Sequence, residues 1–160
     1  MLILRAILFS ILLPGFITIG MPLLLTPHRE IENPAAFTLL AFGFLLYLAS
    51  LLRFLDAGGT PAIFLTRNFR WIVGSEPDNM VHGGIYRFSR NPMYISFMTV
   101  TAGMAWLIGS RSAAIYAALL IPIFHFVVVL LEEPHLRRKL GAGYEAYLRS
   151  TPRWIGLPNR

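Results

Sequence analysis

The chain has 160 residues, of which 56% are hydrophobic and 14% are charged, whereas soluble domains carry about 25% charged residues. So short a chain cannot hide this much apolar surface in its own core, and its mean hydropathy of +0.61 favours lipid as the surrounding solvent. The absence of cysteine excludes a disulfide framework, a thiolate nucleophile and a cysteine metal site.

Four blocks of the sequence contain no Asp, Glu, Lys or Arg, at residues 6–26, 33–52, 91–110 and 112–131. Each is about the 20 residues that a helix needs to cross a bilayer, and a charge at the bilayer centre costs at least ~2.5 kcal/mol. Lipid satisfies no backbone donors, so each block is predicted to be a helix. The predicted fold is a single domain, 1–160, of the all-α integral membrane class with about four transmembrane helices.

The basic residues are distributed unevenly between the ends of these blocks. With the N-terminus in the cytoplasm, all but Arg29 and Arg111 of the 14 Lys and Arg residues fall on the cytoplasmic side. This positive-inside bias predicts cytoplasmic termini, in an inner or endoplasmic membrane. Anionic lipid then accounts for the formal charge of +6, and no nucleic-acid partner is predicted.

Two cytoplasmic stretches remain, 56–90 and 132–160. The first is a loop interrupted by glycine and proline, and long loops in small proteins are usually functional or disordered. Within it, residues 63–73 mix apolar side chains with arginine, as an interfacial segment does. In the second stretch, 134–149 is predicted to be an amphipathic helix, because apolar residues recur at Leu136, Leu140, Tyr144 and Leu148.

The first group of residues that suggests chemistry surrounds the start of the third block. It comprises Gly84-Ile85-Tyr86 and Arg90-Asn91-Pro92-Met93-Tyr94. A structural interpretation accounts for it, with Asn91 as the cap of the helix and Pro92 in its first position. The tyrosines would then be interfacial and the arginines cytoplasmic anchors. Spacing alone favours this interpretation over a binding site.

The second group is Glu132-Glu133-Pro134, at the cytoplasmic end of the fourth block. Two carboxylates at a helix C-terminus oppose the helix dipole. One interpretation is structural: Pro134 restarts a helix, and Glu133 pairs with Arg137 one turn later. The other is functional, since paired acids beside an apolar span can bind a cation or hydroxyl groups. The residues alone do not decide between the two.

His125 lies seven residues before Glu132, which places both on one face of a regular helix. It is either a hydrogen-bonded packing residue or a base. His82 and His135 do not complete a zinc-binding spacing with the glutamates, so no metal is predicted. No glycine-rich nucleotide loop and no G-x-S-x-G elbow occurs. The residues therefore indicate a small helical membrane protein with charged residues at its cytoplasmic end. They do not identify a reaction.

In order along the chain, these groups resemble the isoprenylcysteine carboxyl methyltransferase and phospholipid methyltransferase superfamily. The resemblance runs from about Gly58 to the C-terminus. Each fragment is weak by itself, but their order on a helical membrane chain is specific. The fragments are Gly59-Thr60-Pro61, 84–86, 90–94, Glu132-Glu133-Pro134, Leu136, Gly141, Tyr144, Tyr147 and Pro152-Arg153-Trp154.

The resemblance implies S-adenosylmethionine as the methyl donor, bound without a Rossmann sheet at the cytoplasmic end of the last two spans. A carboxylate suits the sulfonium, amino and ribose hydroxyl groups of that cofactor, and catalysis would consist mainly of alignment and exclusion of water. Carried over by position, the cofactor-binding residues are Tyr86, Asn91, Pro92, Met93, Tyr94, Glu132 and Glu133. The candidate catalytic residues are Glu132, Arg90 for a substrate carboxylate, and His125 as a base.

Two departures from the prenylcysteine-methylating relatives leave the lipophilic acceptor open. Asp78 occupies the position of their histidine, and Val128 that of an arginine suited to a substrate carboxylate. Lipid amines, prenylated carboxylates and small thiols are therefore all candidate acceptors. The apolar outer faces permit an oligomer without requiring one.

Two other functions compete with methyl transfer. Sterol reductases that use NADPH have a related helical core and a tyrosine-rich tail, and the arginine-rich loop could bind the 2′-phosphate. Glu132 and Glu133 argue against this function, because paired acids suit a cationic sulfonium better than a polyanionic dinucleotide. A non-enzymatic membrane scaffold is the third interpretation.

Overall fold

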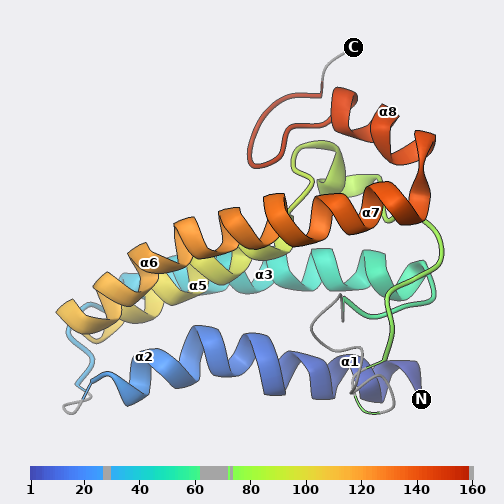
Figure 1. Ribbon diagram of the computed structural model, residues 1–160. Coiled ribbons are helices and arrows are strands. Elements are labelled where there is room, and N and C mark those ends of the chain that lie inside the picture. Colours follow the sequence, from blue (N-terminus) through green and yellow to red (C-terminus); the bar gives the residue numbers. More distant parts are fainter. Residues whose placement is uncertain (27–29, 62–71, 73, 159–160) are drawn as a thin grey trace.

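The computed structural model describes residues 1–26, 30–61, 72 and 74–158, and within them the regular elements are all helical (Figure 1). The predicted interfacial segment 63–73 lies outside the described residues except for Ile72. The long helices lie side by side as a bundle, and the C-terminal segment lies beside one of its ends (Figure 1). In chain order the elements are α1 (Leu2–Ser10), η1 (Ile11–Gly20), α2 (Met21–Leu24), α3 (Ala36–Asp56), η3 (Gly84–Arg87), α5 (Pro92–Leu107), α6 (Arg111–Val127), η4 (Val128–Glu132), α7 (Glu133–Leu140) and α8 (Ala142–Ser150).

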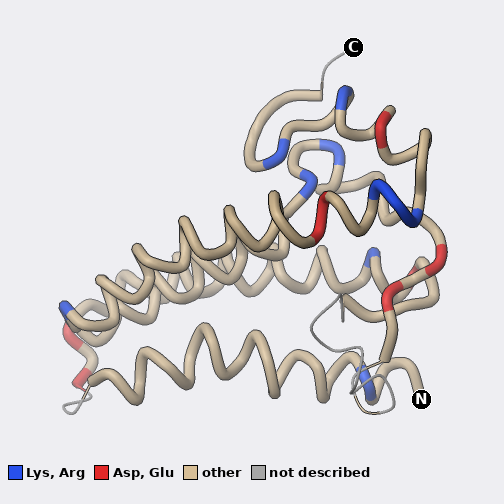
Figure 2. Tube along the Cα trace, viewed as in Figure 1, with Lys and Arg blue, Asp and Glu red and all other residues tan. Residues whose placement is uncertain are grey.

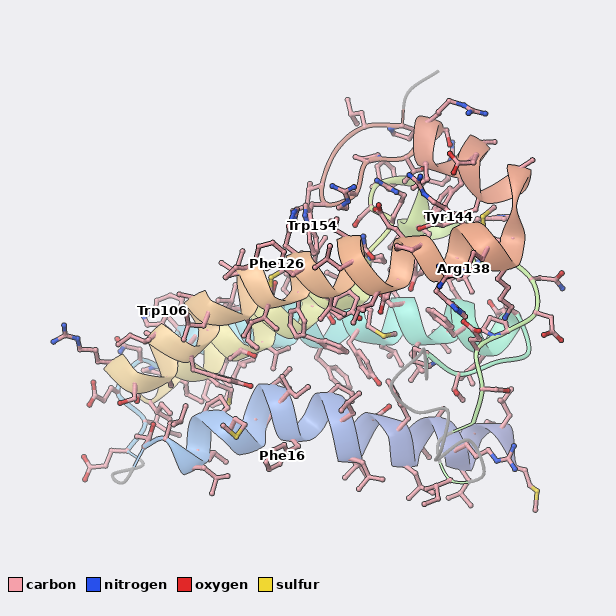
Figure 3. The ribbon with its side chains drawn as sticks, viewed as in Figure 1. Phe16, Trp106, Phe126, Arg138, Tyr144 and Trp154 are labelled. Carbon is pink, nitrogen blue, oxygen red and sulfur yellow. The ribbon has the colours of Figure 1, made fainter. Side chains whose placement is uncertain are left out.

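Three of the helical runs are long and apolar enough to cross a membrane: Leu2–Leu24, Ala36–Asp56 and Arg111–Leu140. They correspond to the predicted spans 6–26, 33–52 and 112–131. Large apolar side chains on their outer surfaces are about half exposed, as lipid contact requires. Figure 3 shows two of them, Phe16 on η1 and Phe126 on α6, which are 50% and 59% exposed, and also Trp106 on α5, which is 48% exposed.

The predicted span 91–110 corresponds to α5, which has 16 residues and is shorter than the roughly 20 residues of a typical span. The expectation of four spans is therefore confirmed only in part. The length of this uncharged block overestimates the length of α5, because the residues that begin and end the helix are themselves uncharged. Pro92 takes the first helical position, and Gly109 turns the chain with a φ of +58°. α5 is also the central helix, with nine buried residues against α3 and α6.

Glycines allow α3 and α5 to approach closely. A Cβ on Gly43 would lie 2.7 Å from Val100 Cγ2, and one on Gly103 would lie 2.9 Å from Leu40 Cδ2. Small residues at such contacts let two helix backbones pack tightly in a membrane. This contact fixes α5, whose cap is Asn91 and whose first turn carries Pro92, Met93 and Tyr94.

We expect Gly43→Ala to destabilise the protein by about 1–3 kcal/mol, because the added methyl group overpacks the α3–α5 contact. The matched control is Gly143→Ala on α8, where a Cβ meets nothing within 4 Å. That change should stabilise its helix by about 0.5–1 kcal/mol. Thermal unfolding in detergent measures both, and equal melting temperatures for the two variants would contradict the packing argument.

The last span does not end before the two glutamates. α6 continues through a π-helical turn, η4, directly into α7, so that Pro134 lies within one continuous helix that runs to Leu140. Gly141, with a φ of +57°, then breaks the chain direction, and α8 follows. The predicted single helix over 134–149 is therefore wrong in its bounds. Apolar residues recur at every fourth position on both sides of Gly141. This pattern therefore does not show that the helix ends there, whereas the backbone conformation of Gly141 does.

Most of the Lys and Arg residues lie at one end of the bundle (Figure 2). The N-terminus, the end of α3, α7 and α8 lie there, whereas α6, which begins with Arg111, starts at the opposite end (Figures 1 and 2). The described part of the 56–90 loop folds back at the charged end, where the Thr60 N–H donates to the Ser75 carbonyl (2.8 Å).

Candidate active site

A cavity of about 200 Å³ lies at the charged end of the bundle, between η1, α5, the α6–α7 helix, α8 and the 76–81 loop. One part of its lining is apolar and includes Phe9, Leu13, Ile17, Phe97, Phe124 and Val127. Another part is polar and includes Glu76, Asn79, Arg90, Asn91, Glu132 and Glu133. A site with both kinds of lining can hold a hydrocarbon chain next to a charged ligand.

Glu132 is a buried carboxylate at this cavity, with 7% of its surface exposed. The hydroxyl of Tyr94 donates a hydrogen bond to Glu132 Oε1. The Tyr94 ring also packs against Phe124, with centroids 4.8 Å apart, and Phe97, at 5.9 Å. The π-helical turn and the first turn of α5 thus bring an acidic side chain and aromatic faces together, a combination that suits a cationic ligand.

Glu133 points its carboxylate at two arginines. Arg153 binds it with two nitrogens, Nε to Oε1 (2.7 Å) and Nη2 to Oε2 (3.0 Å), and Arg90 donates from Nη1 to Oε1 (3.0 Å). The side chains of Arg90 and Glu133 are 8% and 7% exposed. The hydrogen bond and charge of Glu133 raise the pKa of the Arg153 guanidinium. Glu133 therefore joins three separate segments of the chain by charge-assisted hydrogen bonds.

Arg90 keeps hydrogen-bonding capacity beyond this pair. Its Nε is buried and has no partner among the described residues. A buried donor without a partner costs about 1–3 kcal/mol, so this atom is a candidate for contact with a ligand.

The C-terminal tail, residues 151–156, runs beside the segment that precedes α5. The Arg90 N–H donates to the Pro152 carbonyl (3.0 Å), and the Gly156 N–H donates to the Phe88 carbonyl (3.1 Å). Asn91 occupies the cap position of α5, but its side-chain Nδ2 donates to the Arg153 carbonyl (2.9 Å) instead of capping the helix. Sequence reasoning assigned no role to Arg153, and its place in the Pro-Arg-Trp motif was the only signal available.

Three tyrosines surround the polar part of the cavity. The Tyr147 hydroxyl donates to the Tyr86 carbonyl (2.7 Å), and both side chains line the cavity with Tyr144. Burial, assisted by the charge of Glu133, raises the pKa of Tyr144 to about 12, and burial also raises the pKa values of Tyr86 and Tyr147. These hydroxyls keep their protons at neutral pH and act as donors rather than as bases.

Most of the sequence-predicted site residues line this cavity: Tyr86, Arg90, Asn91, Met93, Tyr94, Glu132 and Glu133. Pro92 and His125 do not. Pro92 is fully buried at the first position of α5. The sequence also gave no indication of Glu76, which lines the cavity and pairs with His135 (2.9 Å) and Lys139 (3.2 Å) of α7.

His125 lies away from the cavity because of the π-helical turn between it and Glu132. One extra residue in a helical turn rotates the following side chains by roughly 100°. Phe124, rather than His125, therefore shares the cavity-lining face with Val128 and Glu132. His125 instead accepts a hydrogen bond at Nδ1 from the Trp154 indole (3.3 Å) and stacks on its ring. Figure 3 shows Trp154 and Tyr144 on the same side of the α6–α7 helix.

Comparison with known proteins identifies the family. The family model for phospholipid methyltransferases matches residues 31–143. A protein-S-isoprenylcysteine O-methyltransferase of Schizosaccharomyces pombe is 29% identical over 126 residues, which cover 74% of this chain and 53% of that relative. The chain thus spans about half the length of the curated relative, and no solved structure matches it significantly. The predicted resemblance is confirmed: the chain belongs to the phospholipid methyltransferase family of integral membrane methyltransferases, whose enzymes use S-adenosylmethionine.

Proposed function

We propose that this chain transfers a methyl group from S-adenosylmethionine to a lipophilic acceptor in the cavity lined by Tyr94, Arg90 and Glu132. The observation that carries the proposal is the position of Glu132. It is a buried carboxylate at a cavity whose lining is partly charged and partly apolar, in a chain of the matching family.

The residues at the polar part of the cavity fit the functional groups of this cofactor. Arg90 Nε is a buried donor without a partner among the described residues, and a carboxylate would satisfy it. Glu132 suits an ammonium group or ribose hydroxyls. The rings of Tyr94 and Phe124, with centroids 4.8 Å apart, suit a sulfonium cation.

When bound, S-adenosylmethionine supplies an electrophilic methyl group on its sulfonium. The chain's own residues would orient and shield the reactants. Glu132 and Arg90 would fix the polar end of the cofactor by charge, with Tyr86, Asn91, Met93 and Tyr94 around it and Pro92 setting the start of α5. The apolar lining would hold the acceptor's hydrocarbon chain and exclude water. We assign His125 no role in the reaction, because it does not line the cavity.

Calorimetric titration of the detergent-solubilised protein with S-adenosylhomocysteine tests this function, with NADPH as the comparison ligand. We expect saturable binding of S-adenosylhomocysteine alone. Binding of NADPH alone would overturn the proposal in favour of a reductase, and binding of neither would favour a scaffold. Transfer of a labelled methyl group to a lipid amine, a prenylated carboxylate or a long-chain thiol then identifies the acceptor class.

We also propose that both termini and the cavity's polar part face the cytoplasm. Because the chain lacks cysteine, introduced cysteines report membrane sidedness cleanly. Arg111→Cys should react with a membrane-impermeant thiol reagent only from the extracytoplasmic side, and Arg138→Cys, which is exposed on α7, only from the cytoplasm. Labelling of both positions from one side would contradict this topology.

A further inference from the structure

We infer that Arg153 is a positioning residue that keeps the Arg90 guanidinium free to bind the carboxylate of the cofactor. The inference rests on the proposed function. Arg153 lies in the C-terminal tail, beyond the residues 31–143 that the family model matches. It would act on the ligand through Glu133 and Arg90, without touching the ligand itself.

Two arginines share the carboxylate of Glu133 unequally. Arg153 occupies both oxygens of Glu133 through its Nε and Nη2. Arg90 is left with a single bond from Nη1 to Oε1, and its Nε has no partner among the described residues. A two-nitrogen fork is the preferred geometry between an arginine and a carboxylate. Arg153 therefore holds the position on Glu133 that Arg90 would otherwise take.

Charge supports the same conclusion. Glu133 and Arg90 alone would neutralise one another, whereas the second guanidinium leaves this cluster with one excess positive charge. An anionic group of a ligand would restore the balance. Glu132, which is also buried, remains for the cationic groups of the cofactor.

Hydrogen bonds from neighbouring residues hold the C-terminal tail, and with it Arg153, in this position. The backbone carbonyl of Arg153 accepts from Asn91 Nδ2 (2.9 Å), and the neighbouring Pro152 carbonyl accepts from the Arg90 N–H (3.0 Å). The residue after Arg153 is also held, because the Trp154 indole donates a hydrogen bond to His125 Nδ1. The segment before α5 and the tail are thus fixed to one another at the residues that share Glu133.

A pair of ligands separates this role from a purely structural one. S-adenosylhomocysteine carries the carboxylate, and 5′-deoxy-5′-(3-aminopropylthio)adenosine is the same molecule without it. In Arg153→Ala, Arg90 should turn to form the two-nitrogen fork with Glu133. We expect the affinity for S-adenosylhomocysteine to fall about tenfold or more, as for a lost charge-assisted hydrogen bond. The affinity for the decarboxylated ligand should stay within about twofold.

Three further variants complete the calorimetric experiment. Arg153→Lys keeps the charge but cannot form the fork, so it should lose affinity for S-adenosylhomocysteine to an intermediate degree. This variant also serves if Arg153→Ala does not fold. In an Arg90→Gln background, Arg153→Ala should have no additional effect, because the atom on which it acts is gone. Arg138→Ala, a change at an exposed arginine of α7, is the control and should bind both ligands as the wild type does.

Equal losses for both ligands would overturn the inference, since Arg153 would then support the site only structurally. Unchanged binding of S-adenosylhomocysteine in both Arg153 variants would overturn it too. Both results require a wild-type protein that binds S-adenosylhomocysteine, so they leave the proposed function standing. A wild-type protein that binds neither ligand would overturn the proposed function together with the inference.

Discussion

Glu132→Gln is expected to weaken the binding of S-adenosylhomocysteine by roughly 10- to 150-fold, as for the loss of a hydrogen bond to a charged group. The substitution keeps the size of the side chain and an oxygen for the Tyr94 hydroxyl. It removes only the negative charge that would bind the amino or ribose groups. Because an incompletely paired buried carboxylate costs free energy, the melting temperature should stay the same or rise.

Titration calorimetry and thermal unfolding of the same detergent preparation measure the two effects separately. The control is Glu145→Gln on α8, whose carboxylate makes an exposed pair with Arg137. Such surface pairs contribute little, so both readouts should match the wild type. If Glu132→Gln bound S-adenosylhomocysteine with wild-type affinity, Glu132 would not belong to the cofactor site.

Glu133→Gln is expected to act mainly on stability, although it is the same substitution at the next residue. It leaves Arg90 and Arg153 facing one another without the carboxylate that they share. Removal of one partner from a buried ion pair typically costs about 3 kcal/mol or more, which lowers the melting temperature of a protein of this size by roughly 10 °C. The affinity for S-adenosylhomocysteine should fall as well, because the segment before α5 and the tail lose their common anchor.

The matched control for stability is Glu30→Gln, at an exposed carboxylate in the connection between α2 and α3. Its melting temperature should equal that of the wild type. A Glu133→Gln variant that melts with the wild type would show that the Arg90–Glu133–Arg153 cluster does not hold the fold together. Glu132 and Glu133 would then not divide into one residue that binds the cofactor and one that stabilises the fold.

Sequence spacing could not predict which residues Glu133 binds. The sequence neighbours of the two glutamates suggested a helix start at Pro134 and a pair between Glu133 and Arg137, one turn away. In the fold, Glu133 binds Arg90 and Arg153, which lie 43 and 20 residues away in sequence. Which donor reaches a carboxylate depends on how distant segments pack, and periodicity carries no information about that.

The same limit explains His125. Regular helical geometry placed it on the face of Glu132, and one π-helical turn moved it to Trp154. The widened turn leaves no distinct pattern in the apolar residues Val128 to Leu131. A sequence reading that assumes a regular helix therefore assigns the wrong neighbour, Phe124 being the residue that shares the cavity with Glu132.

The sequence by itself determined the features that depend on local composition. Apolar blocks free of charge predicted membrane helices, and ordered motifs from Gly59 to Trp154 predicted the family. Both predictions depend only on local sequence, because each helix contacts the bilayer individually and a motif is recognised from the residues within it. Only the tertiary structure decided the short length of α5, the break at Gly141 and the partners of Glu133. These depend on backbone turns and on contacts between distant segments, whose energies are set by the packed fold.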